Sequence, residues 1–204
     1  QTDAAELTVT LDPGGSTAVR RLIVPAFYTF EELHNVLQTV FPWENYHLHR
    51  FILSQDDYGK PMEIIAAADV ERDDEDTHHL ESEVRLSAVF QANSWTEDRT
   101  IIYHYDFGDD WKHTIKLERI IPQYNKIYSQ CTFMKGDAPP EDVGGPPGFQ
   151  YVLDVLQNEE HEDHSNIKSW IRSMSWRPIA EGDIDKVNQR LRERMYGHYW
   201  RLRK

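Results

Sequence analysis

The segment from Tyr103 to Ile115, YHYDFGDDWKHTI, constrains the fold of this chain more than any other stretch. Apolar and polar residues alternate along both of its halves, and this period of two predicts two half-buried strands. Residues 107–110 join the halves and supply the Gly and Asp residues that tight turns favour. The segment therefore predicts a β-hairpin with a buried phase of Ile101, Tyr103, Tyr105, Trp111, His113, Ile115 and Leu117.

Two motifs together carry a family resemblance: YHYDFGDDWKHTIKLE, from Tyr103 to Glu118, and PPEDVGGPPG, from Pro139 to Gly148. In these motifs the chain resembles the plasmid pRiA4b ORF-3-like family. The resemblance covers nearly the whole chain and includes Arg20–Pro25, His47–Phe51 and Asp185–Asn188. It implies an α+β fold. The family's label as transposon-associated "TnpR" proteins points to mobile elements but assigns no reaction.

The charge balance narrows the classes of function. The chain has 204 residues and a formal net charge of −13, whereas a general duplex-DNA binder needs clustered cations, so duplex DNA is not an expected partner. The single cysteine, Cys131, excludes an internal disulfide and a cysteine-based zinc site, and it fits an intracellular, reducing compartment. No apolar run approaches the roughly 18 residues of a transmembrane helix, so no membrane partner is expected.

The predicted architecture is one α+β domain over residues 1–204, with a core sheet over about 5–135 and a helical part over about 147–204. A mixed or antiparallel sheet is expected, with one helix across a face and a C-terminal helical set. Thr29 is a suitable N-cap for the first helix, which continues through Val40. Further strands are predicted at 7–11, 19–24, 46–53 and 129–134, and further helices at 147–157, 166–174 and from Asp183 onward. The family resemblance favours a short helix at 86–90.

The region between Gln55 and Ser82 is acidic, with six carboxylates close together at Asp69, Glu71, Asp73, Asp74, Glu75 and Asp76. Such a composition is typical of a solvated loop. We therefore expect this region to contribute little to the core.

Histidines and carboxylates in the motifs make a divalent metal site possible in chemical terms. His47 and His49 are two residues apart on a predicted strand, so both point to one face and can present two imidazoles to a metal. The expected ligand set is His47, His49, Asp106, Asp109 and Glu141. The alternative is structural, because histidines in strands serve as hydrogen-bond partners and aspartates in turns cap backbone amides.

The same motifs also predict a pocket for a small ligand, or for a peptide or protein partner. Carboxylates and aromatic rings surround the hairpin turn, and prolines stiffen the 139–147 loop. The pocket residues would be Tyr105, Asp106, Asp109, Asp110, Trp111, His113, Glu141 and Asp142. In the architectural alternative, these carboxylates accept hydrogen bonds from turn amides.

The C-terminal tail, residues 190–204, differs from the acidic body because cations alternate there with aromatic residues. Such a tail can stack on single-stranded nucleic acid, or it can dock against the acidic body. Docking is the prediction, because a chain of net charge −13 repels phosphate.

Two classes of function follow. The favoured class is a non-enzymatic binding domain with a groove around the hairpin and the 139–142 loop. The other class is a metal-dependent hydrolase or nuclease associated with mobile elements, using the metal-ligand set named above. The sequence alone assigns neither the ligand nor the oligomeric state.

Overall fold

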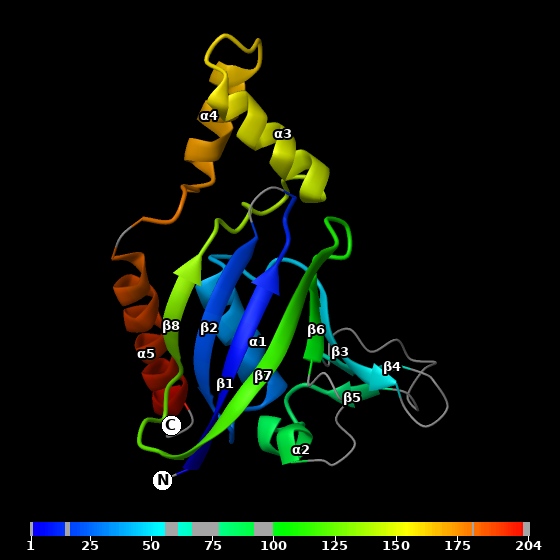
Figure 1. The fold of residues 1–204 in the computed structure, drawn as a ribbon, viewed down its shortest axis with the longest axis vertical. Helices are drawn as coiled ribbons and strands as arrows, with labels where there is room; N and C mark the ends of the chain where they lie inside the picture. Colours follow the sequence, from blue (N-terminus) through cyan, green and yellow to red (C-terminus); the bar gives the residue numbers. More distant parts are fainter. Residues whose placement is uncertain are drawn as a thin grey trace.

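An eight-stranded sheet forms the body of the molecule in the computed structural model, which describes residues 2–14, 17–55, 61–66, 78–91, 100–180 and 182–201 (Figure 1). The strands run in the order β5-β4-β3-β6-β7-β1-β2-β8. All neighbours pair antiparallel except β4 and β5, which are parallel, so the sheet is mixed. The strand bounds are β1 (Thr2–Leu11), β2 (Ala18–Pro25), β3 (His49–Gln55), β4 (Pro61–Ile65), β5 (His78–Leu80), β6 (Thr100–Tyr105), β7 (Trp111–Tyr124) and β8 (Gln130–Lys135).

The predicted hairpin is formed by β6 and β7. Tyr105 pairs with Trp111, and Tyr103 pairs with His113, so the aromatic residues face each other across the two strands. The alternation predicted from the sequence is confirmed, because the whole inward phase is buried and Trp111 is only 1% exposed. The turn between the strands is closed by the Asp110 amide, which donates to the Asp106 carbonyl at 2.7 Å.

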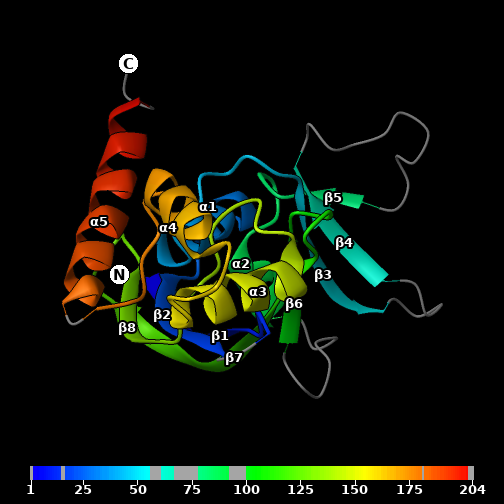
Figure 2. The same cartoon turned by 90° about the horizontal axis from the view of Figure 1, so that it is seen from above.

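Helix α1 (Phe30–Val40) lies across one face of the sheet, behind the strands in Figure 1 (see also Figure 2). Thr29 caps it as predicted: its hydroxyl accepts from the Glu32 amide, and the Glu32 carboxylate accepts from the Thr29 amide. Apolar side chains of α1 such as Leu33 and Leu37 are fully buried and join the inward phase of the strands in one hydrophobic core. This confirms the expected α+β class.

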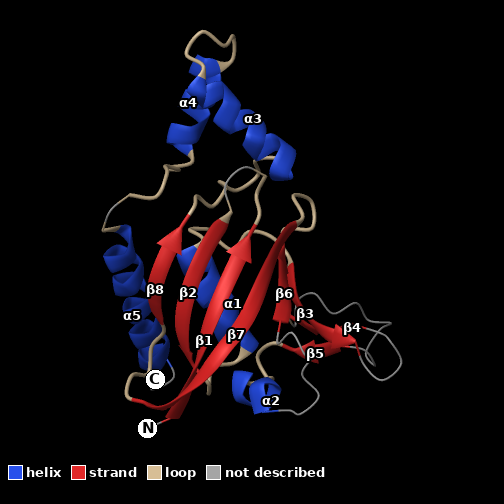
Figure 3. Ribbon diagram, viewed as in Figure 1, coloured by secondary structure: helices blue, strands red, loops and turns tan. Residues whose placement is uncertain are grey.

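Three helices follow the sheet (Figure 3): α3 (Gly145–Gln157), α4 (His164–Ser173) and α5 (Asp183–Arg201). Helices α3 and α4 pack on each other and project beyond the ends of the central strands. Helix α5 runs along the edge strand β8, where Asn188 makes two hydrogen bonds to the backbone of Cys131. Arg194 donates to the Asn35 carbonyl of α1 at 3.1 Å, so the tail is docked at least as far as that residue.

Several element boundaries differ from the sequence prediction. The strand expected from Tyr46 begins only at His49, because three backbone amides before it donate to side chains instead of to a neighbouring strand. Two strands, β4 and β5, lie inside the region expected to be a solvated loop, so that expectation is wrong for residues 61–65 and 78–80. Residues 67–77, which carry the acidic run, lie outside the described residues.

Two further elements complete the description. Residues 86–91 form the helix α2 (Leu86–Gln91), as the family resemblance favours. Among the described residues, no helix has the length and apolar character needed to cross a membrane.

Candidate metal centre

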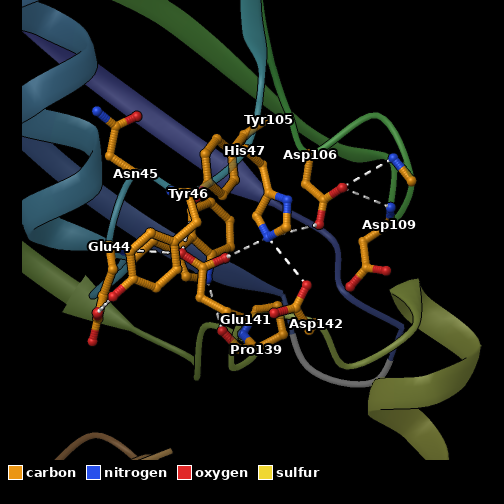
Figure 4. A network of polar contacts seen from close by, with 12 residues as sticks. Glu44, Asn45, Tyr46, His47, Tyr105, Asp106, Asp109, Pro139, Glu141 and Asp142 are labelled. Atoms are coloured by element: carbon orange, nitrogen blue, oxygen red, sulfur yellow. Dashed lines mark hydrogen bonds and ion pairs between the residues drawn. The ribbon is translucent and has the colours of Figure 1, made fainter.

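Three carboxylates converge on the imidazole of His47 (Figure 4). His47 Nε2 lies 3.2 Å from Asp142 Oδ1, 3.6 Å from Asp106 Oδ2 and 3.8 Å from Glu141 Oε2. The ligand atoms of His47, Asp106 and Asp142 all lie within 4.8 Å of one another. His47 comes from the loop before β3, Asp106 from the hairpin turn, and the other two carboxylates from the loop before α3.

Two of the converging atoms are buried and lack a hydrogen-bond partner. They are His47 Nε2 and Glu141 Oε2. Glu141 is only 6% exposed, so its unpartnered oxygen is held away from bulk water while it points toward the imidazole. Buried polar atoms without partners are uncommon in native proteins, and each one needs an explanation, such as an ion.

The second oxygen of each buried carboxylate is already engaged, and this fixes the direction of the free one. Asp106 Oδ1 accepts from the amides of Gly108 at 2.9 Å and Asp109 at 3.2 Å. Glu141 Oε1 accepts from the Glu44 amide and from the Tyr105 hydroxyl, both at 2.9 Å. Each carboxylate therefore uses one oxygen to anchor itself and presents the other to His47.

The loop that carries His47 is held by side chains. Three consecutive amides donate: Glu44 to Glu141 Oε1, Asn45 to Gln38 Oε1 and Tyr46 to the Tyr105 hydroxyl. Trp43 adds a fourth tie, because its indole Nε1 donates to the Pro139 carbonyl at 2.9 Å. The imidazole is thus brought to the carboxylates by a loop without regular structure whose backbone is nevertheless fixed.

The hairpin turn and the loop before α3 are joined directly. Asp109 Oδ2 accepts from the Gly144 amide at 3.1 Å. Gly145 lies against the same turn at φ +69°, where a Cβ atom would come within 2.9 Å of the Asp109 carbonyl. A glycine is required at this position both for its conformation and for the close approach.

Backbone strain is concentrated here. Asn45, Asp106 and Asp142 adopt left-handed φ angles of 57°, 55° and 56°. Asn and Asp tolerate this conformation better than other residues with a side chain, but it still has a free-energy cost that the surrounding structure must offset. Such strain is found preferentially at functional sites. Here the strained residues are two of the three acidic residues, Asp106 and Asp142, and Asn45 in the loop that carries the imidazole.

Glu141 is an acidic residue of the site whose pKa is shifted by its surroundings. Burial raises the pKa of its carboxyl above the usual range, although the Glu44 amide and the Tyr105 hydroxyl oppose this. Burial and the nearby Glu141 carboxylate raise the pKa of Tyr105, so this hydroxyl keeps its proton and remains a donor. A cation at the free oxygens would offset the free energy required to keep a buried carboxylate ionised.

The spacing of the ligand atoms fits a shared cation. With metal–ligand bonds of about 2.1 Å, neighbouring ligand atoms lie about 3.0 Å apart in an octahedron and about 3.4 Å apart in a tetrahedron. The 3.2 Å separation of His47 from Asp142 falls in this range, and the 3.6 and 3.8 Å separations from Asp106 and Glu141 are a few tenths of an ångström wider. The 3.2 Å contact between His47 Nε2 and Asp142 Oδ1 is also within hydrogen-bond distance, so it is the convergence of three carboxylates on one nitrogen that fits a cation.

Comparison with known proteins is consistent with this architecture. The model of the plasmid pRiA4b ORF-3-like protein family matches residues 3–186. The chain belongs to this family. It is 33% identical over 183 residues to the uncharacterized protein y4hQ of Sinorhizobium fredii (strain NBRC 101917 / NGR234), covering 90% of this chain and 88% of that one. It also resembles the crystal structure of MM3350, a protein of unknown function from Methanosarcina mazei Go1. The TM-score is 0.71 and the identity 34%, over 83% of this chain and 89% of that one.

The pRiA4b ORF-3-like motifs thus supply most of the centre, but not every residue expected in it. Of the metal-ligand set, His47, Asp106 and Glu141 come together, with Asp142 from the predicted pocket. His49 shares the inward face, but its Nε2 contacts Glu81 Oε2 at 2.8 Å. Asp109 binds a backbone amide instead of facing the imidazole, which agrees with the architectural alternative for that residue.

The remaining pocket residues have different positions. Trp111 and His113 lie inside the core at 1% and 0% exposure, so a ligand contact for them stays a prediction. Asp110 lies on the outer side of the hairpin, where it contacts Lys112 at 2.8 Å and His104 at 2.7 Å. Hydrogen bonding to Lys112 lowers the pKa of Asp110.

Sequence reasoning missed the residues that hold the His47 loop, above all His34, Gln38 and Asn45. A signal was present, because His34 and Gln38 are polar residues four apart on the apolar face of α1. Both are nearly fully buried, at 2% and 1% exposure. Polar residues at such positions point to a specific hydrogen-bond partner, which here is the loop after the helix.

Proposed function

We propose that this protein is a binding module in which His47, Asp106 and Asp142 hold a divalent cation, with Glu141 as a fourth ligand. The observation that carries the proposal is a pair of buried atoms without a hydrogen bond, His47 Nε2 and Glu141 Oε2, which lie 3.8 Å apart among three carboxylates. A cation satisfies both atoms at once and offsets the repulsion among three acidic groups.

The ligand set favours a divalent first-row transition metal over calcium or magnesium. Carboxylate oxygens suit Mg²⁺, Ca²⁺ and Mn²⁺, whereas an imidazole nitrogen suits Zn²⁺, Fe²⁺ and Ni²⁺. One imidazole with two or three carboxylates is acceptable to Mn²⁺ or Zn²⁺, and the absence of a thiolate near His47 among the described residues removes the strongest preference for zinc. Mn²⁺ is therefore the most suitable probe.

The net charge of the centre and of the chain favours a binding role over the cleavage of nucleic acid. A divalent cation among three ionised carboxylates leaves the centre with one net negative charge, in a chain that already carries −13. Such a centre attracts phosphate poorly, and its cation is a weakened Lewis acid because its charge is already neutralised. The charge argues against a nuclease and favours a cation that orders the loops for a neutral or cationic partner.

Titration calorimetry with Mn²⁺ tests the proposal. We expect one saturable site in the parent protein and its loss in His47→Ala. Asp142→Asn is the milder variant, because the side chain is exposed and asparagine tolerates the φ of 56°, so the fold is retained while one charge is removed. His79→Ala, an exposed histidine on β5, is the matched control. Equal Mn²⁺ binding by the parent, His47→Ala and Asp142→Asn would contradict the proposal.

One observation favours a second candidate, metal-assisted hydrolysis. Glu141 has a raised pKa and a free oxygen beside the place of the cation, which are the properties of a general base for a metal-bound water. The substrate would be a neutral amide or ester, in keeping with the charge of the centre. At saturating Mn²⁺, hydrolysis of a neutral ester probe that is lost in Glu141→Gln supports this function, and equal rates in both proteins refute it.

A further inference from the structure

A closed ring of hydrogen bonds lies beside the metal centre and includes three buried side chains. The Asn45 amide donates to Gln38 Oε1 at 2.8 Å, and Gln38 Nε2 donates to the Tyr103 hydroxyl at 3.1 Å. That hydroxyl contacts His34 Nδ1 at 2.8 Å, and His34 Nε2 contacts Asn45 Oδ1 at 2.8 Å. The ring begins and ends at Asn45, two residues before His47.

The direction of every hydrogen bond in the ring is fixed by its first member. A backbone amide can only donate, so Gln38 presents its oxygen to Asn45 and its NH₂ group to Tyr103. The Tyr103 oxygen accepts from Gln38, and its proton is therefore available for His34 Nδ1. This leaves the proton of His34 on Nε2, where it is donated to Asn45 Oδ1. Only the neutral Nε2–H tautomer of His34 completes the ring.

The surroundings of His34 hold its ring in that orientation. The imidazole stacks on His49 with ring centroids 3.6 Å apart and planes within 7°. His49 is in turn anchored by Glu81 at 2.8 Å. Burial is the main cause that lowers the pKa of His34 to about 3, with a smaller contribution from His49, so the ring stays neutral near physiological pH.

We infer that His34, Gln38 and Tyr103 are positioning residues that preset the 44–47 loop for cation binding, an inference that rests on the proposed function. The ring binds both the amide and the side chain of Asn45 and so maintains its left-handed φ of 57°. The two amides beside it, those of Glu44 and Tyr46, reach Glu141 and Tyr105 only while that conformation is kept. Buried residues of α1 and β6 thereby set the place of His47 without touching the cation.

A pair of tyrosine variants separates this role from a general contribution to stability. Tyr103→Phe removes one hydroxyl from the ring. Tyr28→Phe removes the hydroxyl of another buried tyrosine, which donates to the Ile127 carbonyl at 3.0 Å and takes no part in the ring. Loss of a residue that orients metal ligands weakens metal affinity by about 10- to 100-fold, so we expect Tyr103→Phe to bind Mn²⁺ that much more weakly. Tyr28→Phe should bind like the parent, whatever stability it loses.

A second variant, at an exposed position, keeps the inference testable if Tyr103→Phe fails to fold. Asn45→Gly keeps the backbone amide and adopts the left-handed conformation freely, but it removes the acceptor of the His34 bond. We expect weaker Mn²⁺ binding for this variant as well. Parent-like affinity in both Tyr103→Phe and Asn45→Gly, or an equal loss in Tyr28→Phe, would overturn the inference.

Amide hydrogen exchange in the metal-free protein tests the positioning role independently of the cation. Exchange at Glu44, Asn45 and Tyr46 should be faster in Tyr103→Phe than in the parent or in Tyr28→Phe. If the parent binds no Mn²⁺, the proposed function fails, and the exchange rates alone then decide whether the ring holds the loop. Unchanged rates at these three amides in Tyr103→Phe would refute the ring's role.

Discussion

At the scale of single residues, Glu141 combines burial with an acidic side chain. Its carboxylate is buried, anchored through one oxygen and unpartnered at the other. A raised folded-state pKa means that the folded protein binds a proton here more tightly than the unfolded chain does. The contribution of this group to stability is therefore present at low pH and is lost as pH rises through the folded pKa.

Glu141→Gln should accordingly stabilise the metal-free protein at neutral pH while weakening Mn²⁺ binding. Gln keeps an oxygen for the Glu44 amide and the Tyr105 hydroxyl but carries no buried charge. We expect an increase of about 0.5–2 kcal/mol in the free energy of unfolding, as for other substitutions that trade function for stability. Thermal melts and calorimetry measure the two effects. A less stable variant with parent-like Mn²⁺ affinity would mean that Glu141 is a purely structural carboxylate.

His113 gives a second prediction at this scale, on the pH dependence of stability. Burial lowers its pKa to about 3, and Nδ1 contacts the Tyr103 carbonyl at 3.2 Å. Between its ordinary pKa of 6.5 and this value, the unfolded chain binds a proton that the folded protein does not. The unfolding equilibrium constant should thus rise about tenfold for each pH unit lost in this window through His113 alone.

Denaturant titrations at several pH values check this. His113→Leu should show a shallower fall in stability with decreasing pH, by one proton. His79→Leu, at an exposed position, is the control for the change of a histidine to leucine outside the core. Equal slopes in the parent and in His113→Leu would show that the histidine is protonated inside the fold.

At the scale of elements, the hairpin could be predicted from the sequence, and the loop that completes the site could not. From Ile101 to Leu117, apolar and polar residues alternate, and only one strand register turns the aromatic side chains toward the core. The local sequence pattern and the tertiary structure therefore agree. Residues 43–47 carry no periodicity, because their amides are satisfied by side chains that are distant in sequence. Glu141, for example, binds the Glu44 amide across a separation of 97 positions. Such a contact follows only from the folded chain.

Contacts that are distant in sequence also explain why His47 and His49 do not share a site. Their spacing predicted one shared face, and both do contact the inward aromatic rings, at Tyr105 and Tyr103 respectively. A shared face does not guarantee a shared site, since Glu81 enters from the turn after β5 and binds His49. The strand β5 was not predicted, because it lies in a region whose composition indicates a loop.

The junction of the hairpin turn with the loop before α3 gives a prediction for this scale. Gly145→Ala should separate the two loops, because its Cβ would meet the Asp109 carbonyl at 2.9 Å. Gly182→Ala is a matched control with φ +82° and no atom within 4 Å of the added Cβ. Both variants should lose about 1–2 kcal/mol from the left-handed backbone. Only Gly145→Ala should also lose Mn²⁺ affinity. Equal Mn²⁺ affinities in the two variants would show that the junction does not set the site.

At the scale of the whole molecule, we expect no binding to nucleic acid, because the net charge is −13 and the tail is docked as far as Arg194. Val187 and Leu191 of α5 are buried, and Arg194 is engaged with the carbonyl of Asn35. Arg194, partnered in this way, is not available for phosphate binding. The position of the last side chains of α5 lies outside the described residues.

Truncation after Glu193 should therefore lower the melting temperature, since it removes the contact of Arg194 with α1. Single-stranded and duplex oligonucleotides should show no binding to the full chain at about physiological salt, because a repulsive body suppresses phosphate contacts. Fluorescence anisotropy over a series of salt concentrations is the measurement. Affinity that falls steeply with salt and disappears on truncation would assign the tail to nucleic acid instead.

The central claim is a cation held by His47, Asp106 and Asp142 with Glu141 as a fourth ligand, and a crystal soaked in Mn²⁺ tests it most directly. The anomalous difference map should show one strong peak about 2.0–2.3 Å from His47 Nε2 and the facing carboxylate oxygens. The peak should be absent from crystals of Asp142→Asn soaked in the same way. A map without a peak at His47, or with the same peak in the variant, would contradict the account.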